Sequence, residues 1–255
     1  MDILADPERL VRFVAQARWQ DPARWRLTRS LVTDVLPLVL DRGHIYATVD
    51  GAEWLVDTGA PVSLSARSSF RLCAHDRAVA ASYLGLDAST LSGFVGRPVS
   101  GLLGMDVMAT LDVAFDIADG TLTLSENPLP VADAVVALGD VMGVPVVQAT
   151  IGGRSSAVFF DTGAQVTYLR DARALGAVPA GELRDFYPGL GEFVTETWHV
   201  DATVGAVTIQ TRCGVLPDLL ELTLQLAGVD GILGSDILAS HRVVMAMRRR
   251  LLSIA

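Results

Sequence analysis

The sequence contains no lysine, so all 20 of its basic residues are arginines, and they face 29 aspartates and glutamates. The resulting net charge of −9 argues against nucleic acid as a partner, because phosphate backbones attract basic surfaces. Long apolar runs are missing too: no uncharged run approaches the roughly 18 residues that a membrane-spanning helix needs. We therefore expect no nucleic-acid partner and no membrane partner.

Cysteine is also scarce, since Cys73 and Cys213 are the only two. They do not occupy corresponding places in the repeat described below, so we expect no disulfide framework. The scattered histidines have no metal-ligand spacing, and no glycine-rich phosphate loop or dinucleotide fingerprint is present. Residues 1–8 lack the basic and apolar regions of a secretory signal. These absences predict no metal, no cofactor and a cytoplasmic location.

What the sequence does contain is a repeat. Apolar residues 54–56 lead into Asp57-Thr58-Gly59-Ala60, and apolar residues 158–160 lead into Asp161-Thr162-Gly163-Ala164. Residues 47–51 match 149–153 upstream, and residues 101–109 match 231–239 downstream. The downstream match continues at a constant offset to Leu124 and Ile254. Three matches in the same order indicate a duplicated domain.

The repeated residues resemble the signature of the aspartic proteases. In that family an apolar strand ends in Asp-Thr-Gly, and a later block of two apolar residues and a glycine supports it, as do Leu102-Leu103-Gly104 and Ile232-Leu233-Gly234 here. The alanine after the glycine is the form found in the retropepsin branch. Retropepsins pair two identical chains and pepsins carry two lobes in one chain. This chain resembles two retropepsin-like domains fused in tandem over about residues 40–255.

The resemblance implies a mostly β, two-lobed aspartic-protease fold built from pseudo-twofold-related β-barrel lobes. We expect a short helical N-terminal extension at 1–38, a first retropepsin-like lobe at 39–126, a linker at 127–142 and a second lobe at 143–255. Asp6-Pro7 and Asp21-Pro22 are typical of helix starts in the extension. Its arginines allow two interpretations: a basic pro-segment that covers an acidic cleft, or a helical cover packed on the first lobe.

A flap is expected in the second lobe only. Asp161 and Gly231 are 70 positions apart, whereas Asp57 and Gly101 are 44 apart. The extra residues include a candidate flap tip, Tyr187-Pro188-Gly189-Leu190-Gly191, followed by a β-rich returning strand at 193–200. We expect the hairpin at 186–200 to cover the site, with Tyr187, Gly189, Leu190 and Gly191 binding substrate. The alternative is a surface hairpin that merely lengthens the sheet.

The two aspartates suit one kind of chemistry. Carboxyl groups about 3 Å apart do not both ionise easily, so Asp57 and Asp161 would share one proton. The ionised member would take a proton from water while the protonated member donates to a peptide carbonyl. The resemblance implies that Thr58 and Thr162 lock the two loops together. Because Ala60 and Ala164 offer the carboxylates no hydroxyl, we expect a less acidic working range than that of pepsins.

These features predict an aspartic endopeptidase that needs no cofactor, acts as a monomer and binds an extended polypeptide by backbone pairing to the flap. The alternative is a catalytically silent peptide-binding or assembly module of the same fold. A highly selective processing enzyme is compatible with the first interpretation. Three smaller expectations are a loop with short strands at 83–100, a hairpin over 113–124 with a turn at Asp119-Gly120, and a solvated turn at 248–250.

Overall fold

The structure is a computed structural model that describes residues 32–170, 172–175, 177–187 and 190–255. Residues 1–31 form one unit of the chain, and the compact unit Val32–Ala255 is the other. The helices predicted within 1–31 lie outside the described residues. The described residues are mostly strand, which confirms the mostly β prediction.

The first repeat is built on three consecutive antiparallel strands, β1 (Thr33–Asp41), β2 (His44–Val49) and β3 (Ala52–Val56). Strand β9 (Gly101–Leu103) pairs in parallel with β3, and β4 (Leu64–Ser65) pairs antiparallel with β9. The segment between β4 and β9 contains two short hairpins and a helix: β5 (Ser69–Leu72), β6 (His75–Ala78), β7 (Ser82–Tyr83), β8 (Leu86–Asp87) and α2 (Ala88–Val95).

The second repeat has the same arrangement. Strands β12 (Val135–Val141), β13 (Val144–Ile151) and β14 (Arg154–Phe160) are consecutive and antiparallel. Strand β19 (Gly231–Leu233) pairs in parallel with β14, and β15 (Thr167–Leu169) pairs antiparallel with β19. Between β15 and β19 lie η3 (Ala172–Leu175), β16 (Val178–Tyr187), β17 (Gly191–Val204), β18 (Val207–Val215) and α4 (Asp218–Ala227).

Each repeat ends in a short helical turn and a hairpin, and the two hairpins join the repeats. They consist of α3 (Met105–Met108), β10 (Asp112–Asp116) and β11 (Thr121–Ser125), and of η4 (Ser235–Ala239), β20 (Val243–Ala246), η5 (Met247–Arg249) and β21 (Leu251–Ile254). Strand β10 pairs with β20, while β1 and β12 add to β11 and β21. The hairpin with a turn at Asp119-Gly120 was predicted correctly. One apolar core extends through both repeats and includes Trp54, Phe115 and Phe160.

Three local predictions are wrong. Residues 33–38, expected in the helical extension, belong to β1, because β2 and β11 supply its backbone partners. Residues 135–141, expected in the linker, form β12 and pair with β13 and β21. Residues 88–95, expected as loop, form α2, since the Asp87 carboxylate accepts from Thr90 N–H over 2.8 Å and caps the helix.

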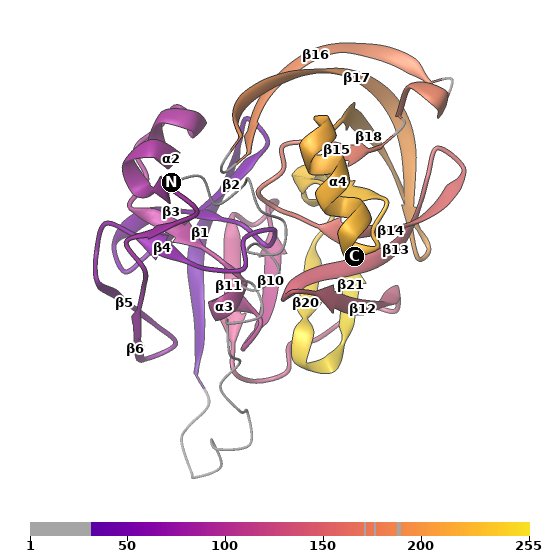
Figure 1. Ribbon diagram of the computed structural model, residues 1–255. Coiled ribbons are helices and arrows are strands. Elements are labelled where there is room, and N and C mark those ends of the chain that lie inside the picture. The colour runs from indigo at the N-terminus through magenta and orange to yellow at the C-terminus, as the bar shows by residue number, and fades with distance from the viewer. Residues whose placement is uncertain (1–31, 171, 176, 188–189) are drawn as a thin grey trace. The chain divides into compact units, whose positions relative to one another are not determined.

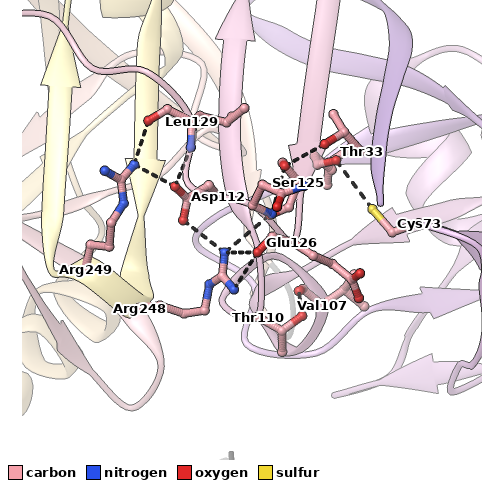
Figure 2. A network of polar contacts seen from close by, with 12 residues as sticks. Thr33, Cys73, Val107, Thr110, Asp112, Ser125, Glu126, Leu129, Arg248 and Arg249 are labelled. Atoms are coloured by element: carbon pink, nitrogen blue, oxygen red, sulfur yellow. Dashed lines mark hydrogen bonds and ion pairs between the residues drawn. The ribbon is translucent and has the colours of Figure 1, made fainter. Parts of the chain in front are cut away.

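The expected solvated turn at 248–250 is also wrong for two of its arginines. Arg248 and Arg249 reach the fully buried carboxylate of Asp112 in β10, at 3.2 and 2.6 Å, as Figure 2 shows. Leu129 N–H donates to the same carboxylate over 3.0 Å. A buried charge needs such partners, because desolvation costs several kcal/mol per ion. This cluster of Asp112, Arg248 and Arg249, here called the Asp112 site, ties the second repeat to the first.

Candidate active site

Two matching strand pairs deliver the predicted aspartates. Strand β3 ends at Val56, directly before Asp57, and β14 ends at Phe160, directly before Asp161. The Asp57 N–H donates to the Leu103 carbonyl in β9, and the Asp161 N–H donates to the Leu233 carbonyl in β19, both over 3.0 Å. The parallel neighbours predicted to support each loop therefore fix the backbone of each aspartate.

Each aspartate is held by the turn that follows it. Asp57 Oδ1 accepts from the N–H groups of Gly59 and Ala60, at 2.8 and 3.0 Å. Asp161 Oδ1 accepts in the same way from Gly163 and Ala164, at 2.8 and 3.3 Å. These bonds fix one oxygen of each carboxyl group and leave the other for chemistry.

The two turns bring the carboxyl groups together. A Cβ atom on Gly59 would lie 2.3 Å from the carboxyl carbon of Asp161, and one on Gly163 would lie 2.4 Å from that of Asp57. Only glycine permits this approach. The two carboxyl groups are also hydrogen-bonded to each other. The structure thus brings the predicted pair, Asp57 and Asp161, into direct contact.

Thr58 and Thr162 cross between the repeats. Each hydroxyl accepts from the other threonine's backbone N–H, at 2.9 and 3.0 Å. Each hydroxyl also donates to a backbone carbonyl of the opposite strand: Thr58 to Phe160 over 2.6 Å, and Thr162 to Val56 over 2.8 Å. Both residues are completely buried. These four bonds, here called the threonine bridge, lock the two turns as the sequence resemblance implied.

The glycines that follow β9 and β19 support the turns from behind. The Met105 N–H donates to the Ala60 carbonyl over 2.8 Å, and the Ser235 N–H donates to the Ala164 carbonyl over 3.0 Å. A Cβ atom on Gly104 would lie 2.8 Å from the Ala60 oxygen, and one on Gly234 would lie 2.4 Å from the Val166 backbone. The apolar-apolar-glycine blocks therefore permit close packing behind both aspartate turns.

Electrostatics favours a shared proton at the pair. Burial raises the pKa of both Asp57 and Asp161, and the neighbouring Asp161 carboxylate raises that of Asp57 further. The backbone N–H groups of the turns oppose this rise. In the described part of the chain, neither carboxyl group forms an ion pair with a basic side chain. Both residues keep partial exposure, so protein atoms surround them closely while solvent still reaches them.

The predicted flap is a hairpin of β16 and β17, here called the flap hairpin, that is longer than the sequence suggested. It spans 178–204 instead of 186–200, and it turns where expected, because β16 ends at Tyr187 and β17 begins at Gly191. In Figure 1 it arches toward β2 of the first repeat. Leu190 N–H donates to the Tyr187 carbonyl over 3.0 Å and closes the turn. Gly189 lies outside the described residues.

The end of the flap hairpin touches the first repeat and approaches the aspartates. The Phe186 ring stacks on Phe94 of α2, with centroids 4.8 Å apart and planes 15° apart. Desolvation raises the pKa of Tyr187 to about 12, and the charges of Asp161 and Asp57 contribute to that rise. Tyr187 therefore lies near the carboxyl pair, although 38% of its surface stays exposed.

Sequence reasoning missed a second group of residues beside the pair. His44, at the start of β2, is buried and hydrogen-bonds to the backbone of Gly163. Asp185, in β16, is also buried and accepts from Gln165 Nε2 over 2.8 Å. No motif marks these residues, because they come from three distant segments. Their Asp-Arg-Gly-His and Arg-Asp-Phe contexts look like ordinary turns and strands.

The other described residues form no metal site, disulfide or membrane-spanning helix. Within the described ranges, no three His, Cys, Asp or Glu side chains gather in a way that could hold a metal ion. Cys73 and Cys213 are buried free thiols. Among the helices that the structure describes, none is long and apolar enough to cross a membrane.

Comparisons with known proteins find a distant likeness in structure and none in sequence. No protein-family model matches the sequence, and no curated protein matches it. Among solved structures, the chain is similar to basic 7S globulin from soybean, with a TM-score of 0.49 and 12% sequence identity. The match covers 89% of this chain and 95% of that one. At this level of likeness, the function has to rest on the geometry of the site.

Proposed function

We propose that the chain is an aspartic endopeptidase and that Asp57 and Asp161 form its catalytic pair. The observation that carries the proposal is the contact between two carboxyl groups that lie in matching turns and have no basic partner among the residues that the structure describes. Placing like charges together is costly, and a structural role does not require it. Strongly perturbed carboxyl groups of this kind are typical of acid–base sites.

The reaction follows from the shared proton. A water molecule bound between the carboxyl groups loses a proton to the ionised carboxylate as its oxygen attacks the peptide carbonyl carbon. The protonated carboxyl group donates its proton to the carbonyl oxygen, giving a neutral tetrahedral diol. Proton transfer to the amide nitrogen then allows the C–N bond to break. The acid and base roles belong to the pair, because its two pKa values are shared.

The remaining residues of the turns hold this geometry. The N–H groups of Gly59, Ala60, Gly163 and Ala164 fix one oxygen of each carboxyl group, and the threonine bridge fixes the turns relative to each other. Such preorganisation lowers the barrier because the reactive groups need no rearrangement when the reaction occurs.

The proposed substrate is an extended polypeptide under the flap hairpin. Backbone groups around Leu190 and Gly191 would pair with it as a further strand. The Tyr187 phenol keeps its proton at neutral pH because its pKa is raised to about 12 by desolvation, so it can donate a hydrogen bond to the substrate. Both aspartates come from one chain, and we propose that a single copy is active.

The test is cleavage of a mixed peptide library between about pH 3 and 7, with products identified by mass spectrometry. Asp57→Asn and Asp161→Asn should each reduce cleavage by about a thousandfold or more, since each removes one member of the acid–base pair. Asp76→Asn is the matched control, because Asp76 is exposed and pairs only with Arg71.

Three outcomes would reject the proposal. Cleavage that survives in either variant of the pair would exclude the shared mechanism. Peptides that bind the wild type without being cleaved would favour the silent binding module instead. If the wild type neither binds nor cleaves any peptide, then repeating the assay without residues 1–31, which leaves β1 intact, decides whether that segment masks the site, and continued inactivity rejects both functions.

A further inference from the structure

The β1–β2 turn of the first repeat inserts into the second repeat. The Gly43 carbonyl accepts from Ser235 Oγ over 2.5 Å. A Cβ atom on Gly43 would lie 2.9 Å from Gln165 Cβ, so the backbone of the turn packs directly against the end of the Asp161 turn. Gly43 has φ +78°, a backbone conformation that residues with a side chain rarely adopt. The turn is therefore built for close contact with the other half of the site.

His44, the next residue, touches the Asp161 turn and the flap hairpin at the same time. Its ring is only 4% exposed. It hydrogen-bonds to the Gly163 backbone, and because its buried Nδ1 has no partner in the described chain, Nε2 makes this bond. The ring centroid lies 5.8 Å from that of Phe186 in the flap hairpin and 6.4 Å from that of Tyr46.

Asp185 completes the link between the flap hairpin and the Asp161 turn. It lies directly before Phe186, and its carboxylate accepts from Gln165 Nε2 at 2.8 Å, from the Phe186 N–H at 2.9 Å and from Tyr168 Oη at 2.5 Å. Gln165 follows Ala164 in the sequence. The flap hairpin, close to its turn, and the Asp161 turn are thus joined twice, through Gln165 and through His44.

We propose that His44 is a positioning residue for the proposed reaction: its neutral form holds the flap hairpin and the Asp161 turn in register, and its protonated form releases them. The inference rests on the proposed function of the pair. The geometry carries it, because a second proton would sit on a buried Nδ1 that has no acceptor among the described residues. Leaving a buried donor unpaired is costly, which favours displacement of the ring.

The charges around His44 set the direction of its response to pH. Burial lowers the pKa of His44, while the nearby carboxylates of Asp185 on β16 and Asp41 on β1, together with the bond to Gly163, partly offset this effect. From β2 itself the ring faces the Tyr46 phenol, whose pKa burial raises to about 12, so it is uncharged. The neutral form is therefore the resident form above the ordinary histidine pKa of about 6.5.

The variant His44→Gln tests the effect of the proton separately from that of the hydrogen bond. The glutamine amide can still donate to the Gly163 backbone, but it does not titrate. In the wild type, kcat/KM should fall about tenfold per pH unit below the pKa of His44. In His44→Gln, that acid limb should move to lower pH while activity near neutral pH stays within about threefold of wild type. His199→Gln is the matched control, because His199 is exposed on β17.

A second measurement does not depend on activity. NMR titrations of the Phe186 amide are compared between Asp57→Asn and the double variant Asp57→Asn/His44→Gln. In Asp57→Asn, the chemical shift of the Phe186 amide should show a step at the titration of His44. In the double variant, that step should be absent. The same step in both proteins would overturn the inference whether or not the chain is a peptidase. If glutamine prevents folding, a His44 ring in Asp57→Asn that titrates without moving the Phe186 amide overturns it equally.

Discussion

The molecule buries carboxyl groups in two ways. At the Asp112 site, one completely buried carboxylate receives two guanidinium groups and a backbone N–H. At the pair of Asp57 and Asp161, two carboxyl groups contact each other, and among the described residues neither has a cationic partner. Both sites lie between the two repeats, and both join residues more than 100 positions apart in the sequence.

Under the proposed function, this difference is the one between a structural and a chemical use of the same side chain. A carboxylate that only ties strands together is most stable when cations neutralise it. A pair that must hand one proton back and forth needs raised pKa values, which a nearby arginine would abolish. We therefore expect the molecule to lose stability at the pair and to keep it at the Asp112 site, which is the trade-off that the proposed activity would require.

The largest effect on stability should come from removing one cation from the Asp112 site. Arg249→Met leaves a buried carboxylate with a single guanidinium, and we expect the free energy of unfolding to fall by about 3–5 kcal/mol. Urea unfolding of Arg249→Met and of the wild type at neutral pH measures this loss. Arg71→Met is the control, since Arg71 and Asp76 are both exposed and the loss should stay below about 1 kcal/mol. Equal losses in the two variants would remove the contrast between the sites.

A smaller loss should follow from opening the threonine bridge. Thr162→Val leaves the Thr58 N–H and the Val56 carbonyl buried without partners, so the free energy of unfolding should fall by about 2 kcal/mol. Cleavage should fall as well, because the aspartate turns lose their lock. Thr208→Val, which breaks only an exposed hydroxyl contact with Thr203, serves as control. An unchanged cleavage rate in Thr162→Val would show that the bridge serves folding alone.

The smallest effect should have the opposite sign. Asp57→Asn removes the repulsion within the pair but keeps an oxygen for the Gly59 and Ala60 N–H groups, so the variant should be about 1–2 kcal/mol more stable than wild type at neutral pH. The pKa of Asp57 is raised in the folded state by burial and by Asp161. The contribution of Asp57 to the stability of the wild type is therefore fully present at low pH. It is lost as the pH rises through the pKa that Asp57 has in the folded state.

Urea unfolding of the wild type and of Asp57→Asn, measured between low and neutral pH, tests the sign of the stability difference. The difference in free energy of unfolding that favours Asp57→Asn should shrink steadily as the pH falls toward the ordinary aspartate pKa of about 3.9. An advantage that does not depend on pH, or a variant less stable than wild type at neutral pH, would mean that the pair is not strained by charge. The distinction from the Asp112 site would then disappear.

Local sequence was informative wherever the structure depends on short motifs. Asp57 and Asp161 were predicted because each ends an apolar strand and begins a glycine turn that occurs twice. The turn at Asp119-Gly120 and the flap turn near Gly191 were predicted from residues that favour tight turns. The same logic identified the glycines behind each aspartate turn, because only glycine allows that approach.

Features that depend on distant partners were not predictable. Strand β1 was read as part of a helical segment, since its partners β2 and β11 give no sign within residues 33–38. Arg248 and Arg249 looked like solvated turn residues because Asp112 is more than 130 positions away. His44 was given no role for the same reason. A single sequence without its relatives carries no record of which residues meet across the fold.

The threonine bridge has a consequence for how the site responds to dilution. Thr58 and Thr162 complete each other's turns from opposite repeats, and one polypeptide carries both. The effective concentration of each half for the other is therefore fixed by the intervening chain and does not follow the amount of protein in solution. A site assembled from two separate copies falls apart as it is diluted, whereas this one keeps both halves at any concentration. A low protein concentration alone would not disassemble the site.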